Sequence, residues 1–344
     1  MEQQTQNDVV LETFPLSTPW PTIDPFLFAV HHNDDYPAGK PNLAPAASLE
    51  GRAIGSDFSG KDGWSMYHGQ SVPGFPQHPH RGFETISYMR SGYIDHSDSL
   101  GATARFGRGD TQWMTAGKGV VHCEMFPLLN QDEPNPLEMF QIWLNLPAAD
   151  KMVDPYFTML WDQDIPKLTV NNAQGRAATI TVIAGAIDGL TPASPPPNSW
   201  ASRAEAEVAV WHISLEPGAS WVMPPTTHRD TKRAIYAFDG SSVDLDGTSL
   251  PVGLGAQIVT DQAVTLTGGT DGVDCLVLQG RPIGEPVAQY GPFVMNHQSE
   301  IQQAMVDYRT TGFGGWPWPN DGPTHAADQG RFALHPDGRK EIPN

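Results

Sequence analysis

The sequence predicts an all-β protein of two domains. The chain has 344 residues, more than a single domain usually holds. Its 34 glycines and 32 prolines exceed the usual share of about 12%, which suits many short strands joined by tight turns. Short apolar runs recur along both halves with turn residues between them, as in sandwiches and barrels. We expect the first domain to span residues 1–160 and the second to span residues 161–344.

Charge and cysteine content narrow the class of protein. The net charge of −19 disfavours direct binding to nucleic acid or to anionic lipid. Two cysteines, Cys123 and Cys275, are too few for a disulfide framework and fit a reducing compartment. The first residues lack the basic start and apolar core of a signal peptide, and no apolar run reaches the ~18 residues of a membrane span. We therefore expect a soluble, cytoplasmic protein without a nucleic-acid or membrane partner.

The first half begins with a proline-punctuated arm, to about residue 21, that is expected to lie on the surface or to fray. Phe26 to Val30 follow as a short apolar strand, with His31 and His32 at its end. A polar turn is the favoured interpretation of this pair, and an additional metal ligand is the alternative. Glycine-broken strands follow from Gly51, and the alternation from Leu137 to Pro147 predicts a further core strand.

The second half repeats this pattern more weakly. Its seven strand-like runs are ATITVIAGAI, EVAVWHISL, SWVMPP, RAIYAFDG, GAQIVT, AVTLTG and DCLVLQG. The segment from Leu190 to Trp200 has too many prolines for a central strand and is expected to be a loop excursion. Near the end, Ile301, Met305 and Tyr308 form one stripe of a short predicted helix. The turn-rich tail from Gly314 is expected to wrap the surface.

Two pairs of potential ligands mark the chemistry of the first half. His78 and His80 are two residues apart, so a strand points them to the same face; His122 and Glu124 share the same spacing. Two such strands can close on one ion, and three imidazoles with one carboxylate suit a divalent transition metal. A structural zinc site is disfavoured because such sites usually rely on cysteine, and Cys123 points to the opposite face.

The second half offers no equivalent pair. His212, His228 and His297 stand alone, without an H-x-H spacing or a neighbouring acceptor pair. We therefore expect one metal ion per chain, bound in the first domain.

Three motifs resemble signatures of the pirin family, in the cupin superfamily. They are HPHRGFET, GDTQWMTAGKGVVHCE and LQGRPIGEPVAQYGPFVMN. The resemblance implies two jelly-roll-like cupin barrels, with Fe²⁺ held in the first by His78, His80, His122 and Glu124. Nickel, copper, manganese, cobalt or zinc are alternative metals in vitro. The family includes quercetin 2,3-dioxygenases, which cleave a flavonol with O₂, and iron-dependent regulators that act through a protein partner.

The carboxylate assignment leaves an alternative. His80 and Glu84 have the spacing of the wider cupin pattern H-x-H-x₃-E, so Glu84 competes with Glu124 as the fourth ligand. The pirin pattern favours Glu124, with Glu84 holding a ligand imidazole. Either carboxylate is a candidate catalytic base for the substrate hydroxyl. Side chains that either line an apolar pocket or belong to the barrel core are Phe83, Trp113, Met114, Phe140 and Trp143.

Two functional interpretations share these ligands. The first is an iron-dependent dioxygenase acting on a flavonol such as quercetin. The alternative is a non-enzymatic redox sensor whose metal changes a surface that a protein partner recognises. A sugar isomerase or epimerase fits the cupin scaffold but has no support in the motifs. The arm, the proline-rich loop and the tail depart from the family pattern and are candidates to cover the mouth of the site.

Overall fold

The computed structural model describes residues 9–343 and divides into two compact units. The unit here called the C-terminal barrel joins residues 9–29 to residues 163–284. The other, the N-terminal barrel, joins residues 30–162 to residues 285–343. This division differs from the expected 1–160 and 161–344 at both ends of the chain. Each terminal segment belongs to the barrel formed by the opposite half of the sequence.

The C-terminal barrel consists of two antiparallel sheets in the described residues. Its strands are β1 (Val10–Pro15), β11 (Lys167–Asn171), β12 (Ala177–Ala184), β13 (Ala209–Leu215), β14 (Ser220–Met223), β15 (Lys232–Gly240), β16 (Ser242–Leu245), β17 (Thr248–Pro251), β18 (Leu254–Ile258), β19 (Val264–Gly268) and β20 (Val273–Gly280). The larger sheet has the order β1-β18-β15-β20-β13-β12-β11, and the smaller one β14-β19-β16-β17. All seven strand-like runs of the second half coincide with strands, which confirms the predicted β architecture.

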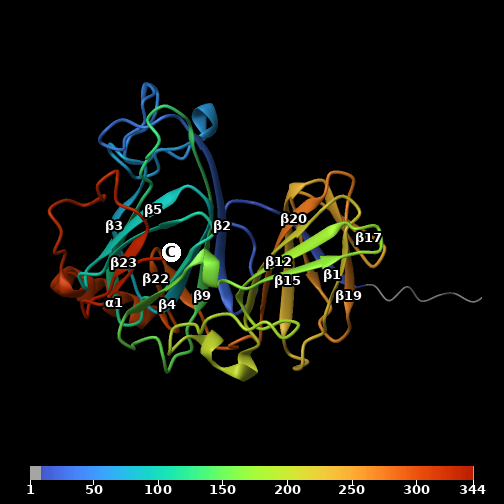
Figure 1. Cartoon of the computed structure of the whole chain (residues 1–344). Helices are drawn as coiled ribbons and strands as arrows, with labels where there is room; N and C mark the ends of the chain where they lie inside the picture. Colours follow the sequence, from blue (N-terminus) through green and yellow to red (C-terminus); the bar gives the residue numbers. More distant parts are fainter. Residues whose placement is uncertain (1–8, 344) are drawn as a thin grey trace, which may run out of the picture. The chain divides into compact units, whose positions relative to one another are not determined.

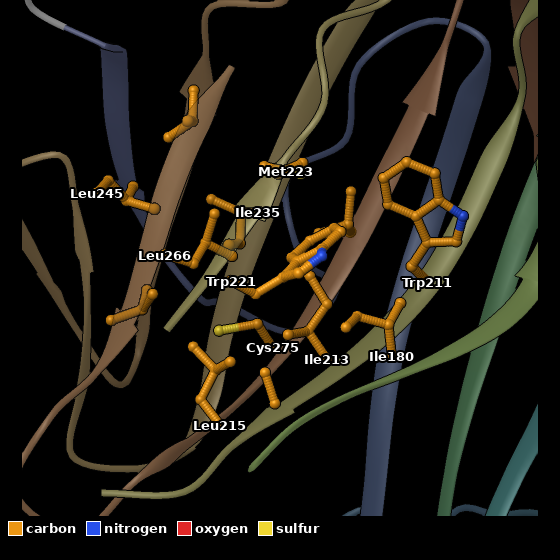
Figure 2. Packing of buried hydrophobic residues seen from close by; sticks show 14 of the residues in the cluster. Ile180, Trp211, Ile213, Leu215, Trp221, Met223, Ile235, Leu245, Leu266 and Cys275 are labelled. Atoms are coloured by element: carbon orange, nitrogen blue, oxygen red, sulfur yellow. The ribbon is translucent and has the colours of Figure 1, made fainter. Parts of the chain in front are cut away.

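An apolar core fills this barrel. Alternation along β13 turns Trp211, Ile213 and Leu215 inward, where they meet Trp221 of β14 and Cys275 of β20 (Figure 2). Each of these side chains is less than 5% exposed. Burial of such large side chains stabilises a fold by about 1.5–3 kcal/mol each. The barrel therefore needs no ligand at its centre to hold it together.

The N-terminal barrel has two larger sheets and one short hairpin. Its strands are β2 (Phe26–Tyr36), β3 (Gly74–His80), β4 (Phe83–Ser91), β5 (Tyr93–Asp98), β6 (Thr103–Gly107), β7 (Thr111–Thr115), β8 (Val120–Met125), β9 (Asn135–Asn145), β10 (Tyr156–Leu160), β21 (Ala288–Tyr290), β22 (Phe293–Met295), β23 (Phe332–Leu334) and β24 (Lys340–Glu341). In the described chain the two larger sheets have the orders β10-β7-β4-β9-β2 and β24-β23-β6-β5-β8-β3. Because β2 continues to Tyr36, the placement of His31 and His32 in a turn after Val30 is wrong; both lie within the strand.

Strand pairing explains why each end of the chain belongs to the barrel formed by the opposite half of the sequence. Val10–Pro15 of the arm form β1, which pairs antiparallel with β18 of the C-terminal barrel, and residues 1–8 of the arm lie outside the described residues. The tail forms β23, which pairs with β6 and carries β24 on its other edge. In Figure 1 the red strand β23 accordingly lies among the blue and cyan strands β3 and β5. Edge strands with unpaired backbone groups thus recruit segments that local patterns could not place.

A buried ion pair fastens the tail to the N-terminal barrel. Arg105 of β6 donates from Nε to Asp95 Oδ1 at 2.6 Å and from Nη2 to Asp95 Oδ2 at 2.8 Å. Its Nη1 donates to the carbonyls of Ala326 and Gln329, both at 2.8 Å. Asp95 in turn accepts from the backbone N–H of His325 at 2.8 Å. A charge pair with every donor satisfied therefore holds one piece of the tail in place.

The predicted helix is present as α1 (Gln298–Thr311). Glu300 accepts from the backbone N–H of His297 at 2.8 Å, which begins the helix. Gly312 ends it with a left-handed φ of 55°. Ile301 is buried, and Met305 and Tyr308 pack partly buried beside it, as the stripe predicted.

Short 3₁₀ turns complete the structure. They are η1 (Lys61–Gly63), η2 (Asp162–Asp164), η3 (Trp200–Ser202), η4 (Ala204–Ala206) and η5 (Gly312–Gly314). Within residues 9–343 no helix is both long and apolar enough to cross a membrane.

Candidate metal centre

Two neighbouring strands of the N-terminal barrel carry the predicted ligands. The register of β3 and β8 places His78 directly opposite His122 and His80 opposite Val120. A bulge between Phe75 and His78 shifts the register, so that Glu124 lies opposite Phe75. The alternation predicted from the spacing thus brings the histidines of both motifs together on adjacent strands.

The three histidines form a cluster. One ring nitrogen of each of His78, His80 and His122 lies within 4.8 Å of the other two. Among the residues that the structure describes, this is the one group of three or more potential ligands in such a range. The ring centroids of His78 and His122 are 4.4 Å apart, and those of His80 and His122 are 4.8 Å apart. Neutral imidazoles at these separations match the donor set of a divalent metal.

Burial keeps these imidazoles neutral. Desolvation lowers the pKa of His78 to about 4 and holds the pKa values of His80 and His122 well below their usual value. His78 Nδ1 donates to the carbonyl of Pro76 at 2.8 Å, which leaves its Nε2 as the ligand atom. Both ring nitrogens of His122 and Nδ1 of His80 are buried without a hydrogen-bond partner in residues 9–343. Buried ring nitrogens without a hydrogen-bond partner are rare in native proteins unless they bind something else, such as a metal ion. These residues therefore fit a metal ion.

Glu124 is near this cluster but is not one of its members. Its Oε1 accepts from Ser87 Oγ at 2.8 Å, and its Oε2 accepts from Gln141 Nε2 at 3.3 Å. Desolvation raises the pKa of this buried carboxyl, and the two hydrogen bonds oppose that shift. The role of Glu124 as the fourth ligand therefore stays a prediction. A metal ion would have to compete with Ser87 and Gln141 for the Glu124 carboxylate.

Glu84, the alternative carboxylate, is fully buried on β4. It accepts from the Thr115 hydroxyl at 2.6 Å, and β-pairing places it between Thr115 and Leu144. The three-histidine group does not include it. Its role as a partner of a ligand or as a base also stays a prediction.

Sequence reasoning missed His96, which lies on β5. The register of β5 and β8 sets His96 opposite Glu124, and its ring centroid is 5.5 Å from that of His122. The ring is fully buried, and in the described residues its Nδ1 has no hydrogen-bond partner. His96 shares the parity of Ile94, a core residue, so alternation along YIDH was the signal that pointed it inward.

Aromatic rings border one side of the cluster. The ring of His80 is 5.1 Å from Phe83 and 5.5 Å from Trp143, which are themselves 4.3 Å apart. Met114, by contrast, is part of the barrel core, and Phe140 stacks on His31 at 4.5 Å. Of the five apolar candidates, Phe83 and Trp143 are thus the two whose rings contact His80.

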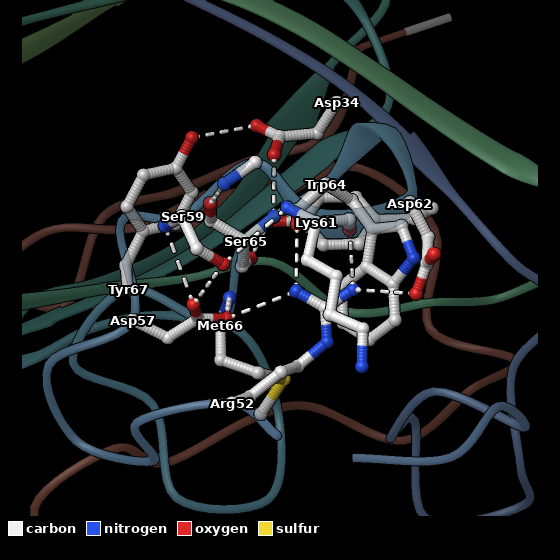
Figure 3. Close-up of polar contacts among 12 residues, drawn as sticks. Asp34, Arg52, Asp57, Ser59, Lys61, Asp62, Trp64, Ser65, Met66 and Tyr67 are labelled. Atoms are coloured by element: carbon white, nitrogen blue, oxygen red, sulfur yellow. Dashed lines mark hydrogen bonds and ion pairs between the residues drawn. The ribbon is translucent and has the colours of Figure 1, made fainter. Parts of the chain in front are cut away.

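A polar network joins Asp34, Arg52, Asp57 and Tyr67 to their neighbours in the N-terminal barrel (Figure 3). Tyr67 donates its hydroxyl to Asp34 Oδ2 at 2.7 Å, and His32 Nδ1 lies 2.9 Å from the same hydroxyl. The Tyr67 ring stacks on Phe75, whose ring meets that of His78 edge-on at 6.4 Å. His32 is therefore not one of the clustered ligands but part of the packing that positions β3.

Arg52 anchors the loop that carries this network. Its guanidinium donates to Asp57 at 3.0 Å and to the carbonyl of Trp64 at 2.7 Å. It also lies 3.4 Å over the Trp64 ring. Contacts at the edge and at the face of one guanidinium thus tie Arg52 to Asp57 and Trp64 within this loop.

The remaining predicted residues fall outside the cluster. Cys123 is fully buried in an apolar cluster with Leu43, Val72 and Met125, and burial raises the pKa of its thiol. His68, a further histidine of this barrel, donates from Nδ1 to the carbonyl of Gly55 at 2.8 Å. His212 of the C-terminal barrel lies 3.3 Å from Asp274. The proline-rich loop belongs to the C-terminal barrel, where it borders a cavity of that barrel.

Comparison with known proteins identifies the family. The pirin model matches residues 46–144, and the model for the pirin C-terminal cupin domain matches residues 210–314. The chain belongs to the pirin family. Human pirin is 32% identical over 262 residues, covering 72% of this chain and 80% of human pirin. Both barrels are therefore cupin domains.

Several similar proteins carry an enzyme name. A protein of Pseudomonas aeruginosa named "Putative quercetin 2,3-dioxygenase" is 35% identical over 254 residues, covering 71% of this chain and 80% of its own length. A crystal structure of quercetin 2,3-dioxygenase from Acinetobacter baumannii superposes with a TM-score of 0.66 and 26% identity. That likeness covers 85% of this chain and 87% of the other.

Proposed function

We propose that this pirin is a metal-dependent dioxygenase that cleaves a flavonol such as quercetin with O₂ at a single Fe²⁺ site. The observation that carries the proposal is the cluster of three neutral histidines with buried, unpartnered ring nitrogens. The names of the Pseudomonas and Acinetobacter relatives support the choice of substrate and reaction. Three imidazoles suit iron, and they suit nickel or copper as well.

His78, His80 and His122 would hold the metal, with Glu124 as the fourth ligand. A bound divalent metal would supply acidity to the flavonol hydroxyl and a site at which substrate and O₂ meet. Phe83 and Trp143 offer aromatic faces beside His80 against which flavonol rings can pack. These rings also exclude water from that side of the ligands.

Glu124 is the proposed acceptor of the hydroxyl proton. Its burial raises its pKa, so its carboxylate holds a proton more readily than an exposed one. Ser87 and Gln141 orient the two carboxylate oxygens by donating one hydrogen bond to each. Glu84 is held by Thr115 instead, and it is the matched carboxylate against which this role is tested.

The test is oxygen uptake by the iron-loaded protein, measured with and without quercetin. We expect flavonol-dependent uptake that Glu124→Gln reduces by about 100-fold or more, the range of a general base. Glu84→Gln should retain more activity because Thr115 can still donate to an amide oxygen. Full turnover in Glu124→Gln with none in Glu84→Gln would reverse the two assignments.

The non-enzymatic alternative has its own outcome. If wild-type protein binds iron fully and shows no quercetin-dependent uptake, the dioxygenase proposal fails. A redox sensor that acts through a protein partner then becomes the leading interpretation, because it needs the same ligands.

A further inference from the structure

The C-terminal barrel contains a cavity that no part of the proposed reaction uses. Its volume is about 500 Å³, within the ~300–1,000 Å³ typical of small-molecule sites. The proline-rich loop contributes one wall through Pro192 and Pro195. The barrel contributes Trp211, Arg233 and Gln279. All of the lining residues belong to this one unit, and none lies near the three histidines in sequence.

Arg233 is a cation in the interior of this barrel. It is only 1% exposed, and its parity on β15 matches that of the core residues Ile235 and Ala237. The register of β15 and β20 sets it directly opposite Gln279. Burying a guanidinium is costly unless the charge is paired, so an inward arginine at this position calls for a partner.

The partners present are neutral. Arg233 donates from Nε and Nη2 to Gln279 Oε1 at 2.7 and 2.5 Å, and from Nη2 to the Pro224 carbonyl at 3.1 Å. Its Nη1 is buried without an acceptor in residues 9–343. No carboxylate of the described residues lies within ion-pair distance of it. The guanidinium thus keeps both an unused donor and an unpaired charge.

The acidic residue in the lining is already engaged. Glu207 accepts from the backbone N–H groups of Thr227 at 2.7 Å and His228 at 3.0 Å, and from the Thr231 hydroxyl. Desolvation lowers the pKa of Arg233 to about 10, and the field of Glu207 opposes that shift. Arg233 therefore remains protonated at neutral pH. Arg203 is a second cation in the lining, so positive charge exceeds negative there.

Apolar side chains form much of the remaining lining, together with the polar side chains of Thr191, Ser194, Thr226 and Thr227. The indole N–H of Trp211 donates to the Gly185 carbonyl at 3.1 Å, which satisfies its polar edge. Its ring lies 5.8 Å from the Arg233 guanidinium carbon. Prolines of the loop and of the β14–β15 connection complete the surface. One cation beside an indole and several prolines fits a ligand with a planar apolar body and one negative end.

We propose that this cavity binds a small aromatic monocarboxylate, with its carboxylate on Arg233 and its ring against Trp211. Carboxylate is the anion that fits because the unpartnered Nη1 can donate a charge-assisted hydrogen bond to one of its oxygens. The cavity is thereby a second ligand site of the chain, separate from the three-histidine centre.

The test is calorimetric titration of the full-length protein with benzoate, with benzamide as the neutral probe of matched shape. We expect saturable benzoate binding with Kd on the order of 1 mM or tighter. Benzamide should bind at least about tenfold more weakly, because it lacks the charge-assisted hydrogen bond. Chelator-treated protein and the His122→Ala variant should bind benzoate as the wild type does, since neither changes the C-terminal barrel.

Two lining variants and one control separate this site from others. Arg233→Gln should abolish benzoate binding, while Arg281→Gln, an arginine outside the cavity lining, should leave it unchanged. Because a buried arginine also supports the fold, Ala186→Phe provides an independent test: it keeps Arg233, and the larger side chain at this exposed lining position is expected to reduce the volume of the cavity. Absent benzoate binding, binding that both lining variants retain, or binding that requires the metal would each overturn the proposal.

Discussion

The two cupin barrels use their interiors in opposite ways. The C-terminal barrel is filled by apolar side chains, among them Ile213, Trp221 and Cys275. The N-terminal barrel buries ionisable side chains at its centre, including His122, Glu84 and Glu124. Both interiors are built by the same alternation along strands, so the scaffold does not decide which kind of interior forms. The residue types at inward positions decide it.

The comparison also shows what a polar interior costs. Each buried polar group without a partner destabilises a fold by about 1–3 kcal/mol. The unpartnered ring nitrogens of His80, His96 and His122 concentrate this cost in the N-terminal barrel. The same barrel also buries charged side chains, in the ion pairs Arg52–Asp57 and Arg105–Asp95, where each charge has a partner of opposite sign. The C-terminal barrel concentrates its own cost at Arg233.

The largest expected change in stability comes from breaking the ion pair that fastens the tail. Asp95→Asn leaves the Arg105 guanidinium buried without its counter-charge, and we expect a loss of about 3–5 kcal/mol. Hydrogen exchange should show lost protection in residues 30–162 and 285–343, with the C-terminal barrel unchanged. Arg339→Gln, at the exposed pair with Glu341, should cost less than about 1 kcal/mol. Equal losses in the two variants would contradict the role of the buried pair.

Removal of a histidine from each barrel should separate their metal binding. His122→Ala should lower metal affinity by more than about 100-fold, because it removes one of the clustered ligands. His212→Ala, in the C-terminal barrel, should retain the wild-type content of about one metal per chain. Elemental analysis of the purified proteins measures both. Unchanged metal in His122→Ala would exclude the three-histidine centre.

The polar network at Asp34 predicts a pH dependence peculiar to the N-terminal barrel. Desolvation raises the pKa of Asp34 to about 6, against the hydrogen bonds from Tyr67 and Ser65. A raised folded-state pKa contributes stability that is present below about pH 4 and is lost as the pH rises through about 6. From pH 4 to pH 7, Asp34→Asn should therefore gain about 2–3 kcal/mol relative to wild type.

Urea unfolding at several pH values measures this difference. Asp35→Asn, at the exposed neighbouring carboxylate, is the matched control; because Asp35 is a lesser cause of the raised Asp34 pKa than desolvation, this variant should stay close to wild type. If Asp34→Asn also runs parallel, the carboxyl of Asp34 does not titrate in this range.

The smallest effect is expected at the two cysteines, one in each barrel. Cys123 and Cys275 are both fully buried, and a serine hydroxyl in either place should cost about 1–2 kcal/mol. Both variants should keep the metal, because Cys123 packs in an apolar cluster away from the ligands. Metal loss in Cys123→Ser alone would mean that the parity of β8 has been misinterpreted.

Local patterns in the sequence predicted what depends on one strand or one turn. The spacing of His78 and His80 and that of His122 sufficed to predict three histidines that the structure brings together, because alternation is a property of each strand by itself. His96 was missed because its approach to His122 depends on β5 pairing with β8. The hydrogen bonds from Ser87 and Gln141 to Glu124 come from two further strands, and spacing carries no information about them.

The exchange of chain ends was beyond sequence reasoning for a related reason. The arm and β18 are far apart in the sequence, as are β6 and β23, and neither arm nor tail has a marked period. Their pairing is decided by which sheet edges stay open once the rest of each barrel has formed. Pairing between strands so far apart cannot be predicted from the residue pattern of a short stretch of sequence.

Because each chain end pairs with a strand far away in the sequence, one strand of each pair is synthesised well before its partner. At ~5–20 residues per second, β18 leaves the ribosome on the order of ten seconds or more after β1. The arm therefore waits as a single unpaired strand. The edge of β6 waits in the same way for β23, exposing backbone groups that can pair with another nascent chain. Neither half of the polypeptide, cut at residue 160, would carry a complete barrel: each would lack strands that the other half encodes.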